Sequence, residues 1–298
     1  MEKLVWFNGK VTTLDEAAIP AADHAHLYGD GLFEGIRIYH SKVFKLDEHL
    51  DRLYFGCKMM GFAMEIAQGD LRQTVLDLCA KSGVTDGYIR LNVTRGTGLG
   101  LDPRAVKTAP NVMVMVSTLS LYPPEFYENG LDAMFSSVRV IAADSLDPRL
   151  KCIGRYASNI MAKAEANRAG VGEALLLNHD GFLTEGTGEN VFLVKDGVLR
   201  TPHPSCGILR GITRDTVIKL AHDAGIACNE ENLTPYDVFE ADECFCTGTA
   251  AEVVAVVKIN GQPVGEGKPG PVTKRLTQLF REHTHTGVPF AAHAGTRP

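Results

Sequence analysis

Two short stretches contain side chains that could take part in covalent and proton-transfer chemistry. The stretch LDPRLKCIGRYASN contains a single lysine, Lys151, and a tyrosine five positions later, Tyr156. The stretch EGTGEN begins with a carboxylate, Glu185, directly before a glycine–threonine–glycine turn. A lysine amine can condense with an aldehyde, and a carboxylate can keep a neighbouring group protonated. Taken singly, however, Lys151 is typical of a solvated surface lysine and Glu185 of a turn residue.

Two further turns could bind an anion. In GITRD, the backbone N–H groups of Ile212 and Thr213 begin a predicted helix, where unpaired N–H groups attract phosphate. In CTGTAAE, Thr249 and Ala250 belong to a small, hydroxyl-bearing turn between two apolar strands. Each stretch also has a simpler interpretation: Thr213 could only cap the helix, and the second stretch could be an ordinary tight turn.

Motifs for several other cofactors and nucleophiles are missing from the sequence. GTGLGL and GTGENV lack the third glycine of a dinucleotide-binding fingerprint, and neither runs from a strand into a helix. There is no Walker loop, G-x-S-x-G elbow or H-E-x-x-H motif. A lysine, a carboxylate and anion-binding turns together suit pyridoxal phosphate, which needs an amine for its aldehyde, donors for its phosphate and a carboxylate for its pyridine nitrogen.

The composition is that of a globular enzyme with small-molecule partners. The 298 residues are 45% hydrophobic and 22% charged, and the net charge is −6, which disfavours binding to nucleic acid or anionic membranes. No apolar run of about 18 residues could span a bilayer, and the N-terminus lacks a secretory pattern. The seven cysteines and ten histidines are scattered, so we predict reduced thiols, no metal site and a cytoplasmic location.

The elements that must position these residues mix strands and helices without regular repetition. LVWFNGKVT predicts a hairpin with Asn8-Gly9 as its turn, and the pair Cys244 and Cys246 predicts a buried strand with both thiols on one face. The irregular order of strands and helices along the chain favours an α+β fold. Apolar residues at helical spacing predict helices within 43–62, over 69–81, from Ser158 to Arg168, within 211–225 and within 272–283.

The chain is predicted to form two domains. SLYPPEFYENG, at 120–130, is rich in proline and aromatic residues and interrupts both periodicities, so we interpret it as a linker. An N-terminal α/β domain is then expected over 1–119 and a larger domain over 131–283. Residues 284–298 are expected to form a disordered tail.

The sequence resembles the branched-chain amino acid aminotransferases of the class IV (fold type IV) pyridoxal-phosphate enzymes. The resemblance covers about residues 5–282, and its motifs follow the family's order. It implies a two-domain α+β fold like that of D-amino acid aminotransferase, with a small α/β sandwich domain and a larger pseudo-barrel domain that binds the cofactor. The motifs are HLYGDGLFEGIR, HLDRL, YIR, GLGLDP, K…RY, EGTGEN, GITRD and GTAAE.

The resemblance implies a role for each residue around the cofactor. Lys151 should be the Schiff-base lysine, and Glu185 should be the partner of the pyridine nitrogen. Tyr156 should hydrogen-bond the cofactor's phenolic oxygen, and Arg52 should make a charge-assisted contact with the phosphate. The remaining implied phosphate donors are the backbone N–H groups of Ile212 and Thr213 and the hydroxyl of Thr249.

The substrate pocket is implied in the same way. Tyr88 and Arg90 should line it, with Arg90 accepting the distal carboxylate of glutamate, and Phe33 and Gly35 should form its wall. The substrate's α-carboxylate should bind the N–H groups of Thr249 and Ala250. Two residues, Tyr28 and Leu101, resemble residues that enter the site from a neighbouring subunit, so the resemblance implies at least a homodimer.

The activity implied is transfer of an amino group between L-leucine, L-isoleucine or L-valine and 2-oxoglutarate, with Lys151 moving a proton between the substrate's Cα and the cofactor's C4′. The chain departs from the family where Ile153 and Arg155 replace smaller residues and an asparagine, which leaves the substrate range open. Alternatives are a D-amino acid or (R)-amine transaminase, an aminodeoxychorismate lyase, and a non-catalytic scaffold. The Arg-x-His of the D-amino acid enzymes is absent from 97–105. Intact Lys151, Glu185 and Arg52 argue against a scaffold.

Overall fold

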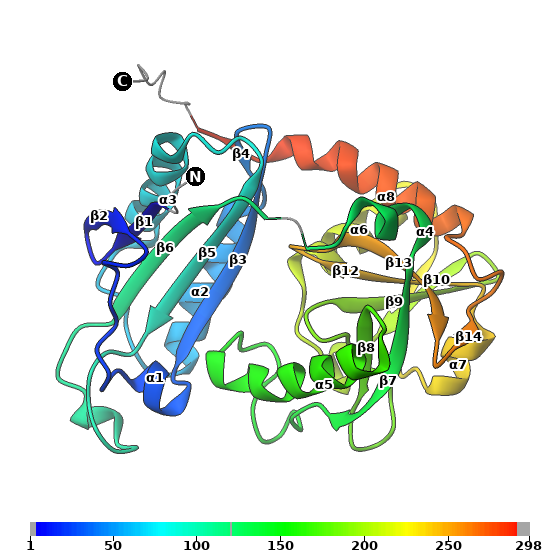
Figure 1. The fold of residues 1–298 in the computed structure, drawn as a ribbon, viewed down its shortest axis with the longest axis horizontal. Helices are drawn as coiled ribbons and strands as arrows, with labels where there is room; N and C mark the ends of the chain where they lie inside the picture. Colours follow the sequence, from blue (N-terminus) through cyan, green and yellow to red (C-terminus); the bar gives the residue numbers. More distant parts are fainter. Residues whose placement is uncertain (1–3, 120, 291–298) are drawn as a thin grey trace. The chain divides into compact units, whose positions relative to one another are not determined.

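The computed structural model describes residues 4–119 and 121–290 (Figure 1). The chain forms two compact units, and each unit takes segments from more than one part of the sequence. Among the described residues, no helix is long and apolar enough to cross a membrane. The first unit contains residues 4–119, 151–154 and 284–290, and the second contains residues 121–150 and 155–283.

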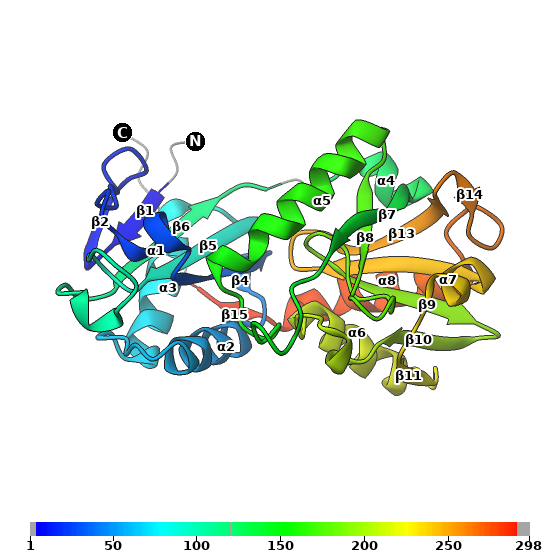
Figure 2. The same ribbon diagram turned by 90° about the horizontal axis from the view of Figure 1, so that it is seen from below.

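The first unit is an antiparallel sheet with two long helices packed on it (Figures 1 and 2). Its elements are β1 (Leu4–Phe7), β2 (Lys10–Thr13), α1 (His24–Tyr28), β3 (Gly31–Tyr39), β4 (Lys42–Val43), α2 (Leu46–Met59), α3 (Gln68–Ser82), β5 (Gly87–Thr94), β6 (Asn111–Ser117) and β15 (Val288–Pro289). The strands lie in the order β15, β4, β3, β5, β6, β1, β2, and all neighbours are antiparallel. The predicted hairpin at Asn8-Gly9 is confirmed.

Alternation along β5 explains how this sheet presents one face to the helices. Ile89, Leu91 and Val93 are fully buried, whereas the residues between them are only half-buried. Leu32 lies opposite Val93 and packs closely against Gly56 of α2, so this apolar face is covered by the helix. Residues of the other parity on β3 and β5 therefore lie on the opposite face, as period-2 geometry requires.

The second unit surrounds a mixed sheet with helices. Its elements are α4 (Pro124–Asn129), β7 (Leu131–Arg139), α5 (Tyr156–Ala169), β8 (Glu173–Leu177), β9 (Asn190–Lys195), β10 (Val198–Pro202), α6 (Ile212–Asp223), β11 (Cys228–Glu231), α7 (Pro235–Glu240), β12 (Glu243–Gly248), β13 (Glu252–Ile259), β14 (Gln262–Pro263) and α8 (Pro271–His283). The strands lie in the order β11, β10, β9, β12, β13, β7, β8, with β14 paired to β13. Helix α5 contacts β7 and β8, whereas α6 contacts β11 and β12, and α8 contacts β12 and β13 (Figure 1).

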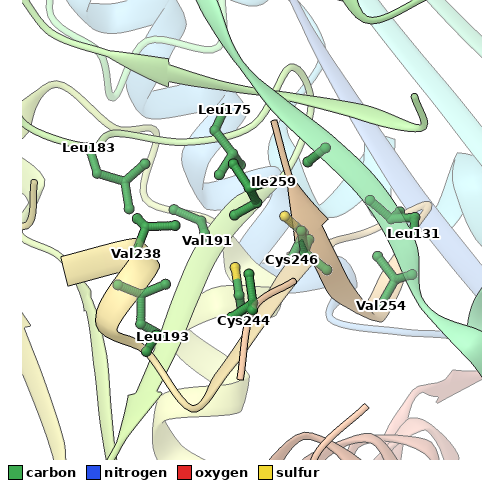
Figure 3. Packing of buried hydrophobic residues seen from close by; sticks show 14 of the residues in the cluster. Leu131, Leu175, Leu183, Val191, Leu193, Val238, Cys244, Cys246, Val254 and Ile259 are labelled. Carbon is green, nitrogen blue, oxygen red and sulfur yellow. The ribbon is translucent and has the colours of Figure 1, made fainter. Parts of the chain in front are cut away.

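The core of the second unit is a continuous apolar cluster (Figure 3). Cys244 and Cys246 both lie in it, so the prediction that they share a buried face is confirmed. Burial raises the pKa of Cys244 to about 12, which keeps this thiol protonated and unreactive. The labelled members of the cluster are Leu131, Leu175, Leu183, Val191, Leu193, Val238, Cys244, Cys246, Val254 and Ile259.

Three segments differ from the expected domain division. Residues 120–130 are more than a linker, because 124–129 form α4, whose first position tolerates proline, and Tyr122 is buried in the core cluster. Residues 151–154 join the first unit instead of a continuous domain over 131–283. In the expected tail, β15 pairs with β4, so residues 284–290 are ordered; residues 291–298 lie outside the described residues.

Candidate active site

Lys151 is held in the first unit by backbone pairing to β3. The carbonyl oxygen of Lys151 accepts a hydrogen bond from the N–H of Phe33 at 3.2 Å, and Cys152 forms a bridge with Leu32. The Lys151 Nζ lies 4.7 Å from the centre of the Phe33 ring. The lysine therefore extends along the same face of β3 as Phe33, at a position set by main-chain hydrogen bonds.

A contact between two glycines makes this pairing possible. Gly29 has a left-handed φ of +72°, and its carbonyl oxygen accepts a hydrogen bond from the N–H of Gly154 at 3.1 Å. A Cβ added at Gly29 would lie 2.6 Å from the Gly154 Cα, closer than such atoms approach in proteins. The segment 151–154 can therefore lie against the end of α1 only when residue 29 has no side chain.

The structure brings four predicted pocket residues together on this face of the first unit. Gly35 and Arg90 are register partners on β3 and β5, and the Arg90 Cζ lies 3.7 Å from the centre of the Phe33 ring. Its Nε donates to Asn92 Oδ1 at 2.8 Å. A Cβ on Gly35 would lie only 2.0 Å from the Tyr88 hydroxyl oxygen, so the absence of a side chain there leaves room for the phenol. The result is an aromatic wall that also carries a cation.

Arg52 is oriented by a buried carboxylate that the sequence interpretation missed. Its Nε and Nη2 donate to the two oxygens of Glu34, both at 2.7 Å, and His49 Nδ1 lies 2.7 Å from Glu34 Oε2. Burial alone would raise the pKa of Glu34, but Arg52 and His49 outweigh it and lower that pKa to about 2. Glu34 therefore remains ionised and fixes the plane of the Arg52 guanidinium. Glu34 lies between Phe33 and Gly35 in a strand that is buried on both faces. An alternating pattern of buried and exposed residues therefore could not identify it.

Glu185 is a buried carboxylate that accepts hydrogen bonds from other residues of the second unit. Its Oε1 accepts from Arg155 Nη2 at 3.0 Å, and its Oε2 accepts from the Leu209 N–H at 2.9 Å and from Asn190 Nδ2 at 3.4 Å. The side chain is 8% exposed. A carboxylate fixed in this way by hydrogen bonds suits a partner for a protonated ring nitrogen.

The predicted phosphate donors other than Arg52 lie in the second unit, and those at the start of α6 are linked to Glu185. Helix α6 begins at Ile212, and its N-cap, Gly211, provides no side-chain cap. The N-terminal N–H groups of α6 are therefore suited to bind an anion. Asn190 connects the two features, because its Nδ2 also donates to the Leu209 carbonyl at 2.8 Å and a Cβ on Gly211 would lie 2.0 Å from its Oδ1.

The remaining cofactor residues occupy element ends. Tyr156 is the first residue of α5, and Thr249 and Ala250 lie in the turn between β12 and β13. Beside that turn, the Thr247 hydroxyl is buried without a hydrogen-bond partner among the described residues, as is Arg155 Nη1. Buried polar atoms without protein partners are the atoms that a polar ligand can satisfy. Together with the uncapped start of α6 and the buried carboxylate of Glu185, they fit an anionic cofactor that has a ring nitrogen.

A pair of buried acids, Glu173 and Glu189, lies at the loop that follows Glu185. Glu173 Oε1 accepts from the N–H of Thr187 at 3.0 Å, and Tyr122 Oη lies 3.3 Å from Glu189 Oε1. Burial and the neighbouring Glu173 raise the pKa of Glu189 well above its ordinary value. Thr187 and Glu189 belong to the EGTGEN motif, but Glu173 of β8 and Tyr122 lie outside it, and only the tertiary structure brings the four residues together.

Two predicted site residues are solvent-exposed. Tyr28 and Leu101 are 42% and 81% exposed in the first unit. Their segments are joined by a hydrogen bond from the Gly100 N–H to the Tyr28 hydroxyl oxygen at 2.9 Å. Among the described residues, no cluster of His, Cys, Asp or Glu could hold a metal ion.

Comparisons with known proteins agree with this chemistry. The model of the class IV aminotransferase family matches residues 31–259. A putative branched-chain-amino-acid aminotransferase of Methanocaldococcus jannaschii is 44% identical over 279 residues, 93% of this chain and 95% of that protein. The branched-chain-amino-acid aminotransferase of Escherichia coli K12 is 38% identical over 281 residues, 93% of this chain and 91% of that protein.

Solved structures extend the comparison to the fold. The crystal structure of the Escherichia coli branched-chain amino acid aminotransferase matches with a TM-score of 0.92 at 38% identity, over 95% of both chains. The enzyme of the same name from Thermobaculum terrenum, solved in its PLP form, matches with a TM-score of 0.86 at 29% identity, over 95% of this chain and 94% of that chain. The chain therefore belongs to the class IV aminotransferases, the pyridoxal-phosphate-dependent family that includes the branched-chain amino acid aminotransferases.

Proposed function

We propose that this enzyme transfers the amino group between L-leucine, L-isoleucine or L-valine and 2-oxoglutarate. The observation that supports it most is the wall made by Phe33, Tyr88 and Arg90. Such an enzyme must accept an apolar branched side chain and a carboxylate in one pocket. An aromatic surface serves the first substrate, and a guanidinium at its edge serves the second. The names of the similar proteins support the same substrates.

When bound, pyridoxal phosphate supplies an aldehyde and an electron-withdrawing ring that stabilises negative charge at the substrate's Cα. Lys151 would hold the cofactor through its Nζ, and as a free amine it would move a proton between the substrate's Cα and the cofactor's C4′. Glu185 holds a proton at the pyridine nitrogen. Tyr156 donates its hydroxyl hydrogen to the phenolic oxygen.

The remaining site residues would bind the cofactor's phosphate and orient the substrate. Arg52, held by Glu34, contacts the phosphate together with the N–H groups at the start of α6 and the Thr249 hydroxyl. The N–H groups of Thr249 and Ala250 hold the α-carboxylate of the substrate. This division leaves Arg90 for the distal carboxylate of 2-oxoglutarate, because its Nε is anchored on Asn92 beside the Phe33 ring.

We further propose a homodimer in which Tyr28 and Leu101 enter the neighbouring subunit's site. Leu99 and Leu101 are 73% and 81% exposed, which is unusual for leucines in a monomer and suits an interface. Leu101→Glu should then give a monomer with intact folding but strongly reduced activity, measured by light scattering and rate assay. A cytoplasmic location is supported by seven free thiols, as in a reducing compartment.

The test of substrate class is a half-reaction followed by the absorbance of the enzyme-bound cofactor. Purified enzyme is mixed separately with L-leucine, D-alanine and an (R)-amine, and 2-oxoglutarate is then added. We expect L-leucine to convert the cofactor to its amine form and 2-oxoglutarate to reverse the change. Conversion by D-alanine or the (R)-amine alone would overturn the proposed donors and the roles of Tyr88 and Arg90. No absorbance after added cofactor would support the scaffold alternative.

A further inference from the structure

Tyr28 is an exposed aromatic residue whose position is nevertheless fixed. Its hydroxyl oxygen accepts a hydrogen bond from the Gly100 N–H at 2.9 Å. Its ring packs edge-on against the ring of His24, with 5.0 Å between the two ring centres, and His24 is only 2% exposed. An exposed aromatic side chain that is already held in one orientation loses little conformational entropy on binding, which is the property required of an interface anchor.

The orientation of the His24 ring depends on Asp30. Burial alone would raise the pKa of Asp30, but Arg95 and His24 outweigh burial and lower that pKa, so the carboxyl group is ionised at neutral pH. His24 Nδ1 lies 3.0 Å from Asp30 Oδ2 and donates to it, because an ionised carboxylate only accepts. The other ring nitrogen, Nε2, is buried without a hydrogen-bond partner among the described residues. Asp30 is therefore the polar partner that fixes the ring beneath Tyr28.

Arg95 in turn holds Asp30 from the end of β5. Its Nε and Nη2 donate to the two carboxylate oxygens of Asp30 at 2.5 Å and 3.1 Å. Arg95 Nη2 also donates to the carbonyl oxygen of Met60, the C-cap residue of α2, at 2.7 Å, and its Cζ lies 4.8 Å from the centre of the Phe62 ring. We call His24, Asp30 and Arg95 the aspartate clamp. It ties α1 to the ends of β5 and α2 within the first unit.

The carboxylate of Asp30 acts on Tyr28 more directly than on the lysine segment. Among the described residues, this carboxylate hydrogen-bonds Arg95 and His24, and neither belongs to segment 151–154. That segment is held instead by main-chain hydrogen bonds, from Gly154 to Gly29 and from Phe33 to Lys151. Replacement of the carboxylate by an amide should therefore disturb the Tyr28 ring and leave the lysine in place.

We propose that the aspartate clamp is a positioning device for the neighbouring subunit, because it fixes Tyr28 where its ring enters that subunit's site. This inference rests on the homodimer proposed above. It requires that Asp30 of one subunit controls substrate affinity in the site of the other subunit and not in its own. A ring displaced by about 1 Å would no longer complete the apolar wall around a branched side chain. We therefore expect Asp30→Asn to raise the KM for L-leucine roughly tenfold with little change in kcat.

The experiment uses hybrid dimers, purified through a different affinity tag on each subunit, in which only one site keeps Lys151. One subunit carries Lys151→Ala, and its partner is wild type, Asp30→Asn, Tyr28→Ala or the control Asp47→Asn. Asp47 forms an exposed ion pair with Arg72 at 2.7 Å, so the control loses an ion pair of the first unit outside the clamp. The competent site of each hybrid has the lysine of the partner and receives Tyr28 from the Lys151→Ala subunit.

The kcat and KM for L-leucine of these hybrids are compared with those of the homodimers, and equilibrium binding of pyridoxal phosphate is measured for each protein. We expect a raised KM and unchanged cofactor binding in the Asp30→Asn homodimer. Its hybrid with Lys151→Ala should regain the KM of the wild-type hybrid. A KM that stays raised in this hybrid, or a wild-type KM in the Asp30→Asn homodimer, would overturn the inference. An equally raised KM in the Asp47→Asn homodimer would also overturn it, because the effect would not then be specific to the clamp.

The Tyr28→Ala arm separates the inference from the proposed dimer. Restoration of the Tyr28→Ala hybrid, with no restoration of the Asp30→Asn hybrid, would keep the shared site and overturn only the inference. A loss that persists in the Tyr28→Ala hybrid would show that Tyr28 serves its own subunit and would overturn the proposed entry into the neighbouring site. If Asp30→Asn does not fold, His24→Phe replaces it, because this variant keeps an aromatic ring beside Tyr28 and loses the contact with Asp30. The same outcomes then decide the inference.

Discussion

Replacement of Gly29 by alanine tests whether the contact of two glycines positions the lysine. The new Cβ would lie 2.6 Å from the Gly154 Cα and 2.9 Å from the Gly154 N. Segment 151–154 would have to retreat by roughly 0.8 Å to restore ordinary van der Waals contact. The Lys151 carbonyl is hydrogen-bonded to Phe33, so this retreat strains the pairing with β3 as well.

Two effects reduce the stability of Gly29→Ala, and the control variant Gly61→Ala separates them. An alanine at φ +72° costs about 1 kcal/mol in backbone strain, and the crowding adds roughly 1–3 kcal/mol. Gly61 has the same φ of +72°, but no atom lies within 4 Å of its Cβ position. The free energy of unfolding of Gly61→Ala should therefore fall only by the backbone strain, and its catalysis should stay normal.

Catalysis should respond more strongly than stability. A misplacement of the lysine amine by about 1 Å is expected to slow the half-reaction with L-leucine by roughly 100-fold. The assays are urea unfolding for both alanine variants, equilibrium binding of pyridoxal phosphate, and the half-reaction rate. If Gly29→Ala and Gly61→Ala lose equal stability and react at equal rates, the glycine contact does not position Lys151 and the reasoning is refuted.

Three further predictions concern the wall and its supports. Gly35→Ala should raise the KM for L-leucine by about tenfold or more with little change in cofactor affinity, because its Cβ would displace the Tyr88 hydroxyl; an unchanged KM in steady-state assays contradicts this. Arg90→Met should slow the half-reaction with 2-oxoglutarate by roughly 100-fold and that with L-leucine only a few-fold; equal losses would remove Arg90 from carboxylate recognition. Glu34→Gln should destabilise the protein by about 3 kcal/mol at pH 7, because Arg52 and His49 lose their carboxylate. The pKa of Glu34 is lowered to about 2, so its contribution is complete above about pH 4.5 and is lost as the pH falls toward 2; a stability difference from wild type that does not shrink in acid would refute the assignment.

Local periodicity and local turn chemistry could be predicted from the sequence alone. The Asn8-Gly9 hairpin, the shared buried face of Cys244 and Cys246, and the helix that ends before Gly170 each depend on residues a few positions apart. Such features follow from the helix and strand repeats and from the conformational freedom of glycine. The eight motifs also identified the family, because their order is preserved along nearly the whole chain.

Pairings between distant residues could not be predicted in this way. Glu34 holds Arg52 because β3 and α2 pack together, and Arg155 holds Glu185 because the start of α5 lies beside the loop after β8. Residues 151–154 join the first unit through hydrogen bonds to the backbone of β3 and the close contact of Gly154 with Gly29.

The sequence by itself thus determined the local elements, the family and the residue types available for chemistry. The tertiary structure alone decided which charges pair in the interior and at which glycines a side chain would clash. The physical reason is that a hydrogen bond or a steric contact depends on distance in space, set by strand register and helix packing, whereas sequence patterns report only the faces of single elements.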